Sequence, residues 1–192
     1  MGKIYYVMGK SASGKDTIFK ELLLKRKGLK KIVPYTTRPL RSGEQEGNEY
    51  YFTTEEMLSG FRKAGKLIEE RTYQTALGPW SYATVDDGKI NLKSRFSYIG
   101  IGTLESYRKM QEYFGEENVA PVFIALDAGI RLQRALNREN MQKQPNYIEM
   151  CRRFLADEED FSEDRLFEAG IRKRYVNEDL GKCLAAIMED MV

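Results

Sequence analysis

A glycine-rich segment near the N-terminus has the residue types and spacing of a phosphate-binding loop. It fits G-x-x-x-x-G-K-[ST] up to its last position and consists of Gly9, Lys10, Ser11, Ala12, Ser13, Gly14, Lys15, Asp16 and Thr17. Glycines let the backbone curl so that N–H groups point at phosphate oxygens, and Lys15 would reach the β- and γ-phosphates of a nucleotide. The hydroxyl residue that usually binds Mg²⁺ is replaced by Asp16. Its carboxylate either binds Mg²⁺, directly or through water, or only complements the dipole of the following helix.

The composition limits which catalytic groups and partners are available. The 192 residues include no histidine, which excludes serine–histidine triads, cysteine–histidine pairs and histidine metal sites. A net charge of +2 does not indicate a nucleic-acid-binding protein, which typically carries a strong excess of basic residues. No apolar stretch approaches the ~18 residues of a membrane span, and the N-terminus lacks the apolar region of a signal peptide. We therefore expect a cytoplasmic protein with small-molecule nucleotide partners, free thiols at Cys151 and Cys183, and no nucleic-acid or membrane partner.

Strand and helix patterns that could position this loop alternate along the chain. The expected strands are 3–8, 95–101 and 119–126, with a short last strand within 171–176. The expected helices are 16–27, 53–64, 103–114, 128–138 and 180–191, and Thr53 with Glu56 forms a capping box for the second. This alternation predicts an α/β fold with a mostly parallel sheet.

Two segments depart from the alternation. Residues 34–84 are rich in aromatic, charged and turn residues, with extended stretches near 49–53 and 67–73, and we expect a small inserted module there. Residues 137–147 are polar and lie between two helical patterns, which predicts either an exposed loop or a mobile lid.

The inserted segment resembles the acceptor-binding signature of the guanylate kinase family. The run T-T-R-P-L-R-S-G-E at 36–44 and G-N-E-Y-Y-F at 47–52 match T-T-R-x-P-R-x-G-E and G-x-x-Y-x-F without a gap, although the proline falls one position early. L-I-E at 67–69 resembles F-[IL]-E, W-S-Y-A-T at 80–84 resembles Y-Y-G-[TS], and Y-V-N-E-D-L at 175–180 resembles V-[VI]-N-[DE]-D-L. The matches occur in order and span nearly the whole chain.

The resemblance implies one domain over 1–192, built as a P-loop kinase core. The core comprises 1–33 and 94–192, a mixed β/α acceptor-binding module covers about 34–84, and a helical lid covers about 134–153. The implied reaction is direct in-line transfer of the γ-phosphate of ATP to GMP or dGMP, with Mg²⁺, giving ADP and GDP.

The resemblance also implies roles for acceptor-side residues. Arg38, Arg41, Tyr50 and Tyr82 would grip the acceptor phosphate, with Glu44 fixing the arginines. Glu69 would accept from N1–H and the amino group of guanine, which adenine lacks as a donor pair. Thr84 would donate to the guanine carbonyl.

Fewer residues are implied on the donor side. R-L-Q-R-A-L-N-R at 131–138 resembles L-x-x-R-L-x-x-R in both arginines and in neither leucine. Arg153 fits the later lid arginine better than Arg152 does. Asn177 would lie near the adenine of ATP. The implied catalytic cations are Lys15, Arg38, Arg41, Arg134, Arg138 and Arg153.

Several positions depart from the family pattern. Gly100 and Gly102 replace the aspartates of I-x-D-[IV]-D-x-x-G, Pro34 replaces a serine, and Ala12 replaces a glycine of the loop. One hypothesis is that Asp16 compensates for the lost carboxylate near Mg²⁺, and another is that base specificity is relaxed or altered. Two alternatives stay open: a catalytically weak binding module, and a kinase of this fold for a different phosphorylated acceptor.

Overall fold

Five consecutive apolar or aromatic residues form the central strand β1 (Ile4–Met8). All five are buried in the computed structural model, which describes residues 2–41, 43–75 and 78–191. A strand that is apolar on both faces is typical of a parallel sheet covered by helices on each side. β1 pairs in parallel with β7 (Ser97–Ile101) and β8 (Val119–Ala125). With β2 (Leu29–Lys31) and β9 (Tyr175–Val176) at the edges, the order is β2-β7-β1-β8-β9. The predicted α/β fold with a mostly parallel sheet is confirmed.

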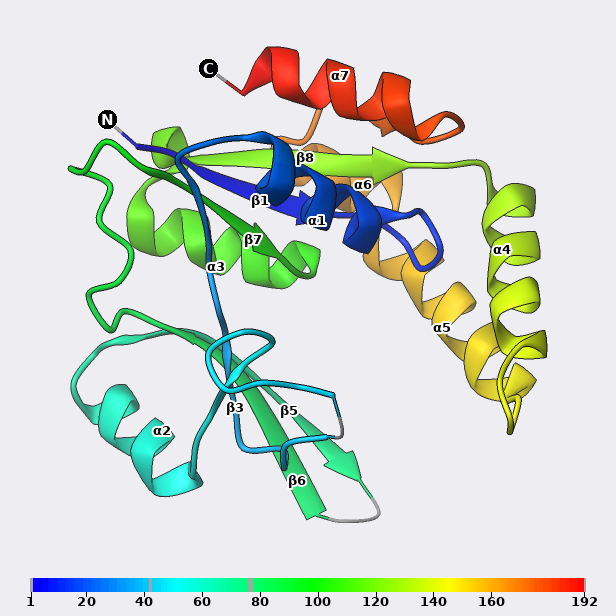
Figure 1. The fold of residues 1–192 in the computed structure, drawn as a ribbon. Coiled ribbons are helices and arrows are strands. Elements are labelled where there is room, and N and C mark those ends of the chain that lie inside the picture. Colours follow the sequence, from blue (N-terminus) through cyan, green and yellow to red (C-terminus); the bar gives the residue numbers. More distant parts are fainter. Residues whose placement is uncertain (1, 42, 76–77, 192) are drawn as a thin grey trace.

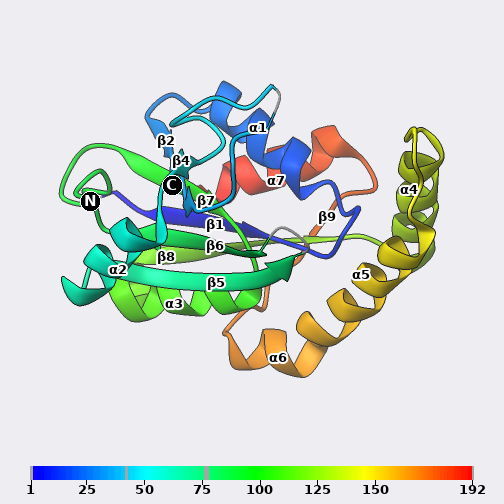
Figure 2. The same cartoon turned by 90° about the horizontal axis from the view of Figure 1, so that it is seen from below.

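Helices cover both faces of this sheet (Figure 1). α1 (Lys15–Lys25) and α7 (Leu180–Asp190) bury one apolar cluster against it, and α3 (Leu104–Phe114) and α6 (Glu163–Glu168) bury another on the opposite face. α4 (Ala128–Asn140) and α5 (Tyr147–Asp160) pack against each other as a hairpin. Figures 1 and 2 both place this hairpin beyond the carboxyl ends of β1 and β8.

A second, smaller sheet is built from residues 35–85. Its order is β4-β3-β6-β5, with bounds β3 Tyr35–Thr36, β4 Tyr51–Phe52, β5 Leu67–Thr75 and β6 Gly78–Val85. The β3–β4 pair is parallel and the other two pairs are antiparallel. α2 (Glu55–Lys63) buries Leu58 in the apolar cluster of this sheet. In Figure 1 this unit extends away from the main sheet on the side of α3.

Two local predictions are wrong. The residue that caps α2 is Thr54, whose hydroxyl accepts from the Met57 amide at 3.4 Å, whereas Thr53 Oγ1 has no hydrogen-bond partner among the described residues. Residues 137–147 are not one loop, because α4 continues through Asn140 and α5 begins at Tyr147. Exposed polar residues are tolerated on a solvent-facing helix, so their polarity did not end α4.

The two cysteines agree with the expectation of free thiols. Cys151 is exposed and Cys183 is buried, and both are free thiols. Among the described residues, no helix has the length and apolar character needed to span a bilayer.

Candidate functional site

The glycine-rich segment turns the chain between β1 and α1. Gly14 has φ 89°, and a Cβ there would lie 2.2 Å from Asn177 Nδ2, so both the backbone and the space require glycine. Ala12 adopts φ 62°, which costs a residue with a side chain roughly 1–2 kcal/mol. Position 12 therefore keeps a conformation that favours glycine although it holds alanine.

Asn177, the residue that follows β9, holds this loop in place. Its Nδ2 donates to the Ser13 carbonyl at 2.7 Å, and its backbone amide donates to Ala125 at 2.9 Å. Arg134 reaches the same place and donates to the Asn177 carbonyl at 3.4 Å. Two residues predicted for the donor side thus lie together beside the loop. The contact of Asn177 with adenine stays a prediction.

Asp16 is the carboxylate nearest to the loop lysine. It lies 3.7 Å from Lys15 Nζ and is largely exposed. Among the described residues, no group of three or more histidine, cysteine, aspartate or glutamate side chains could hold a metal ion. Mg²⁺ in nucleotide sites is usually bound by one or two carboxylates together with substrate phosphates and water. Asp16 therefore fits as one ligand of an ion held mainly by the nucleotide.

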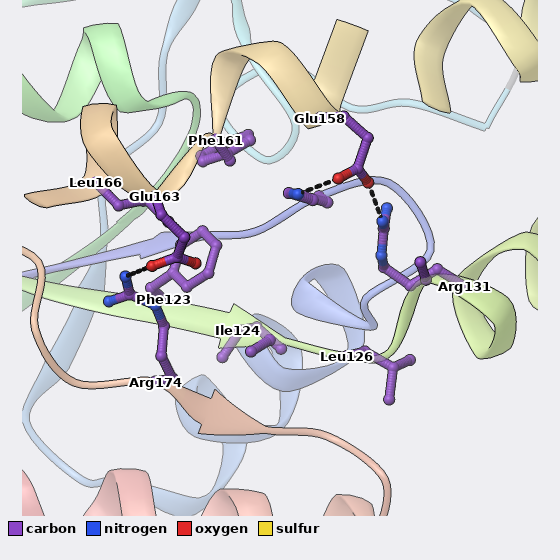
Figure 3. A pocket seen from close by; sticks show the side chains of 12 residues that line it. Phe123, Ile124, Leu126, Arg131, Glu158, Phe161, Glu163, Leu166 and Arg174 are labelled. Atoms are coloured by element: carbon purple, nitrogen blue, oxygen red, sulfur yellow. Dashed lines mark hydrogen bonds and ion pairs between the residues drawn. The ribbon is translucent and has the colours of Figure 1, made fainter. Parts of the chain in front are cut away.

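The C-terminal part of α5 contacts the first residues of the loop. The Asp157 carboxylate accepts from the Ser11 amide at 2.5 Å, and Glu158 pairs with Lys10 at 2.6 Å and also with Arg131 (Figure 3). Burial opposes ionisation of Glu158, but the hydrogen bonds from Lys10 and Arg131 hold its pKa below the usual value. These contacts fasten α5 to the loop, beside a cavity of about 230 Å³. None of these carboxylates was singled out from the sequence.

Arg138 and Arg153 line one hollow together with Ser11. Arg153 Nε lies 2.7 Å from Glu149, which also binds Arg152, and these two arginines lower the pKa of Glu149 to about 2. Exposed pairs of this kind contribute little, so the Arg153 guanidinium can exchange Glu149 for a stronger anion at small cost. Arg152 is not among the residues that line the hollow.

A second cavity, of about 240 Å³, lies between α1 and the smaller sheet. It brings together five residues that sequence reasoning predicted for the site: Asp16, Tyr50, Glu69, Tyr82 and Thr84. It is also lined by Tyr6, Pro34, Arg71 and Gly100. The acceptor-side residues therefore face the surface of the helix that begins at Lys15.

Arg38 does not line this cavity but is fixed beside it, next to Tyr50. It is only 3% exposed, and its two terminal nitrogens donate to the Glu44 carboxylate at 2.6 and 3.0 Å. The Arg41 amide donates to the same carboxylate at 2.8 Å, and the hydrogen bonds from Arg38 and Arg41 lower the pKa of Glu44. Arg38 also lies 5.4 Å from the centre of the Tyr50 ring, which itself packs on Tyr82. Glu44 thus orients a guanidinium toward the two tyrosines.

Arg41 itself is less constrained than Arg38. It is exposed, and its guanidinium lies 5.9 Å from the centre of the Trp80 ring. Its side chain is not among the lining of the second cavity.

Glu69 is buried between two donors. It is 6% exposed, Thr84 Oγ1 donates to its Oε1 at 3.1 Å, and Arg71 Nε lies 3.1 Å from its Oε2. Burial raises the pKa of Glu69, and Arg71 and Thr84 offset part of that rise. Sequence reasoning missed Arg71. The available signal was its spacing of two from Glu69, which places both side chains on one face of a strand.

Comparisons with known proteins identify the family and the fold of this chain. The family model described as guanylate kinase matches residues 1–190. Human guanylate kinase is 26% identical over 184 residues, covering 94% of this chain and 88% of the human protein. The pig guanylate kinase is 27% identical over 187 residues, covering 94% and 87%. The crystal structure of guanylate kinase from Anaplasma phagocytophilum shares the fold, with a TM-score of 0.67 at 21% identity over 98% of this chain and 83% of that one. With a family match over nearly its whole length, the chain belongs to the guanylate kinase family of enzymes.

Proposed function

We propose that this protein transfers the γ-phosphate of ATP to GMP or dGMP. One observation carries the proposal: the cavity that holds Glu69, Tyr50 and Tyr82 is walled by Asp16, the residue next to the loop lysine. A donor phosphate on the loop and an acceptor phosphate in the cavity would therefore face each other across the start of α1.

In the proposed reaction the protein positions two nucleotides and neutralises charge. Loop residues 9–17 hold the donor phosphates through backbone N–H groups and Lys15. Arg38 binds the acceptor phosphate with Tyr50 and Tyr82, and Arg41 approaches from the exposed side. The transferred group is surrounded by Lys15, Arg38, Arg41, Arg134, Arg138 and Arg153. In-line phosphoryl transfer depends mainly on such positioning and electrostatic stabilisation, which requires no histidine.

Mg²⁺ would be held by Asp16 beside the nucleotide phosphates, where it supplies positive charge to their oxygens. Glu69 accepts hydrogen bonds from the guanine edge, and Asn177 supports the loop next to the adenine. We assign 1–33 and 94–192 to the core, about 34–84 to the acceptor-binding module, and about 134–153 to a lid that excludes water when it closes. The separate hydrogen bonding of the smaller sheet supports this division.

The decisive experiment measures ADP formation from Mg·ATP with GMP, dGMP, AMP, CMP and UMP offered separately. We expect turnover with GMP and dGMP, and a loss of about 10²–10³-fold in kcat for Lys15→Ala. Lys27→Ala, which removes an exposed lysine just beyond the C-terminal end of α1, is the matched control. No turnover with any acceptor would contradict the proposal and favour a binding module. Turnover with a different acceptor alone would favour the remaining alternative.

A further inference from the structure

Arg71 faces the carboxylate that the proposed function assigns to the base. Its Nε lies 3.1 Å from Glu69 Oε2 and its Nη2 lies 3.5 Å from Oε1. A guanidinium carries five N–H groups, so the pair with Glu69 leaves most of its donors free. The side chain is one quarter exposed and lines the same cavity as Glu69. Arg71 therefore presents unused donors to any ligand that meets Glu69.

The other donor in contact with Glu69 is already engaged. Thr84 has one hydroxyl proton, and it is directed to Glu69 Oε1 at 3.1 Å. Pro34 offers no side-chain donor at the neighbouring position. Of the two donors on Glu69, Arg71 is thus the one that can also reach a carbonyl on the ligand.

Tyr6 closes the far side of the cavity. A Cβ on Gly102 would lie 2.4 Å from the Tyr6 hydroxyl, and a Cβ on Gly100 would lie 2.8 Å from its ring. The space in front of both glycines is therefore filled by an aromatic side chain, and no carboxylate from β7 can reach the ligand.

We propose that Arg71 determines acceptor specificity by donating to the 6-carbonyl oxygen of a purine whose N1–H faces Glu69. This inference rests on the proposed function, which supplies that orientation of the base. The acceptor class is then a 6-oxopurine nucleoside 5′-monophosphate, because guanine and hypoxanthine both present N1–H beside O6. Adenine in the same pose would place the N1 lone pair against Glu69 and its 6-amino group against Arg71. Both contacts are repulsive, so Glu69 and Arg71 would each disfavour adenine relative to a 6-oxopurine.

The test compares dissociation constants of GMP, IMP and AMP for the wild-type protein and for Arg71→Met, by calorimetry. A hydrogen bond from a charged donor contributes about 1.5–3 kcal/mol, which corresponds to roughly 10–100-fold in affinity. We expect wild-type affinity for IMP within about tenfold of that for GMP, and the preference for GMP over AMP to fall at least ~10-fold in Arg71→Met. Arg62→Met is the matched control, because Arg62 lies in the same unit and pairs with exposed Glu55 and with Glu70.

A second variant separates donation to the ligand from simple neutralisation of Glu69. Arg71→Lys keeps a positive charge beside Glu69 but lacks the fork that reaches two acceptors at once. Because Arg71 lowers the pKa of Glu69, Arg71→Met should move the pH dependence of GMP binding to higher pH. We expect Arg71→Lys to restore the wild-type pH dependence without restoring the preference over AMP. Arg71→Lys also provides the comparison with wild type if Arg71→Met does not fold.

Binding and turnover distinguish the two proposals. Absence of turnover, together with a wild-type preference for GMP over AMP that falls in Arg71→Met, would contradict the proposed function and leave the assignment of Arg71 supported. A GMP-to-AMP preference unchanged within about twofold in both Arg71 variants would overturn the assignment of Arg71, whether or not GMP is phosphorylated. Wild-type affinity for IMP as weak as for AMP would overturn it as well.

Discussion

Gly100 and Tyr6 are predicted to be energetically coupled. They are register partners on β7 and β1, and a Cβ added to Gly100 would lie 2.8 and 2.9 Å from two carbons of the Tyr6 ring. That ring is 3% exposed and packs beside Tyr107, so it has little room to move. Overpacking lowers the free energy of unfolding by about 1–3 kcal/mol, whereas replacing a glycine within a strand by alanine raises it by about 0.5–1 kcal/mol. We expect Gly100→Ala to lower the free energy of unfolding by about 1.5 kcal/mol.

A double-mutant cycle isolates the contact. Tyr6→Val removes the ring and is expected to cost about 3 kcal/mol, through lost burial and a residual cavity. In the double variant the new methyl group occupies the space that the Tyr6 ring has left. The double variant should therefore lose about 2 kcal/mol less stability than the sum of the two single losses. Urea unfolding of the four proteins measures this coupling. Gly60→Ala on α2, where no atom lies within 4 Å, is the control and should be stabilising. A coupling below about 0.5 kcal/mol would refute the reasoning.

Three further outcomes follow from the described contacts. Glu44→Ala should raise the KM for GMP about tenfold or more, with a smaller change in kcat, because Arg38 loses two charged hydrogen bonds; steady-state kinetics would contradict this if KM were unchanged. Thr54→Ala should lower the free energy of unfolding by about 1 kcal/mol, and Thr53→Ala by much less. Equal losses in urea unfolding would contradict the assignment of Thr54 as the cap of α2. Burial raises the pKa of Glu69 above its usual 4.5, and the ionised form binds the base. The KM for GMP should therefore rise as the pH is lowered from about 8 to about 5, and Glu69→Gln should remove that dependence.

Elements with an apolar pattern were predictable because burial fixes them. The strands β1, β7 and β8 lie within the expected ranges, and α3 ends at the expected residue. The failures are at exposed boundaries. Thr53 and Thr54 both have a side chain that can cap a helix, and Thr54 is the cap because α2 begins at Glu55. The continuation of α4 through Asn140 likewise depends on exposure, which the polar pattern does not encode.

The site was predictable only where a motif is contiguous. Residues 9–17 and 36–44 carry their spacing in the sequence, so candidates there could be named. The hydrogen bond between Ser11 and Asp157 joins residues 146 positions apart, and no local pattern encodes such a contact. Arg71 illustrates an intermediate case. Its place on the same strand face as Glu69 was visible, but its ion pair with that residue required the structure.

The attachment of α5 to the phosphate loop has a mechanical consequence. Asp157 lies near one end of this helix, about 15 Å from Tyr147 at 1.5 Å per residue. A rotation of about 20° around the contact with Ser11 would carry Tyr147 through about 5 Å, but Arg153, about 6 Å from the contact, through only about 2 Å. The pivot of such a rotation would be the phosphate-binding loop, to which Asp157 is hydrogen-bonded. Such a turn would displace the outer end of α5 more than twice as far as the backbone of Arg153.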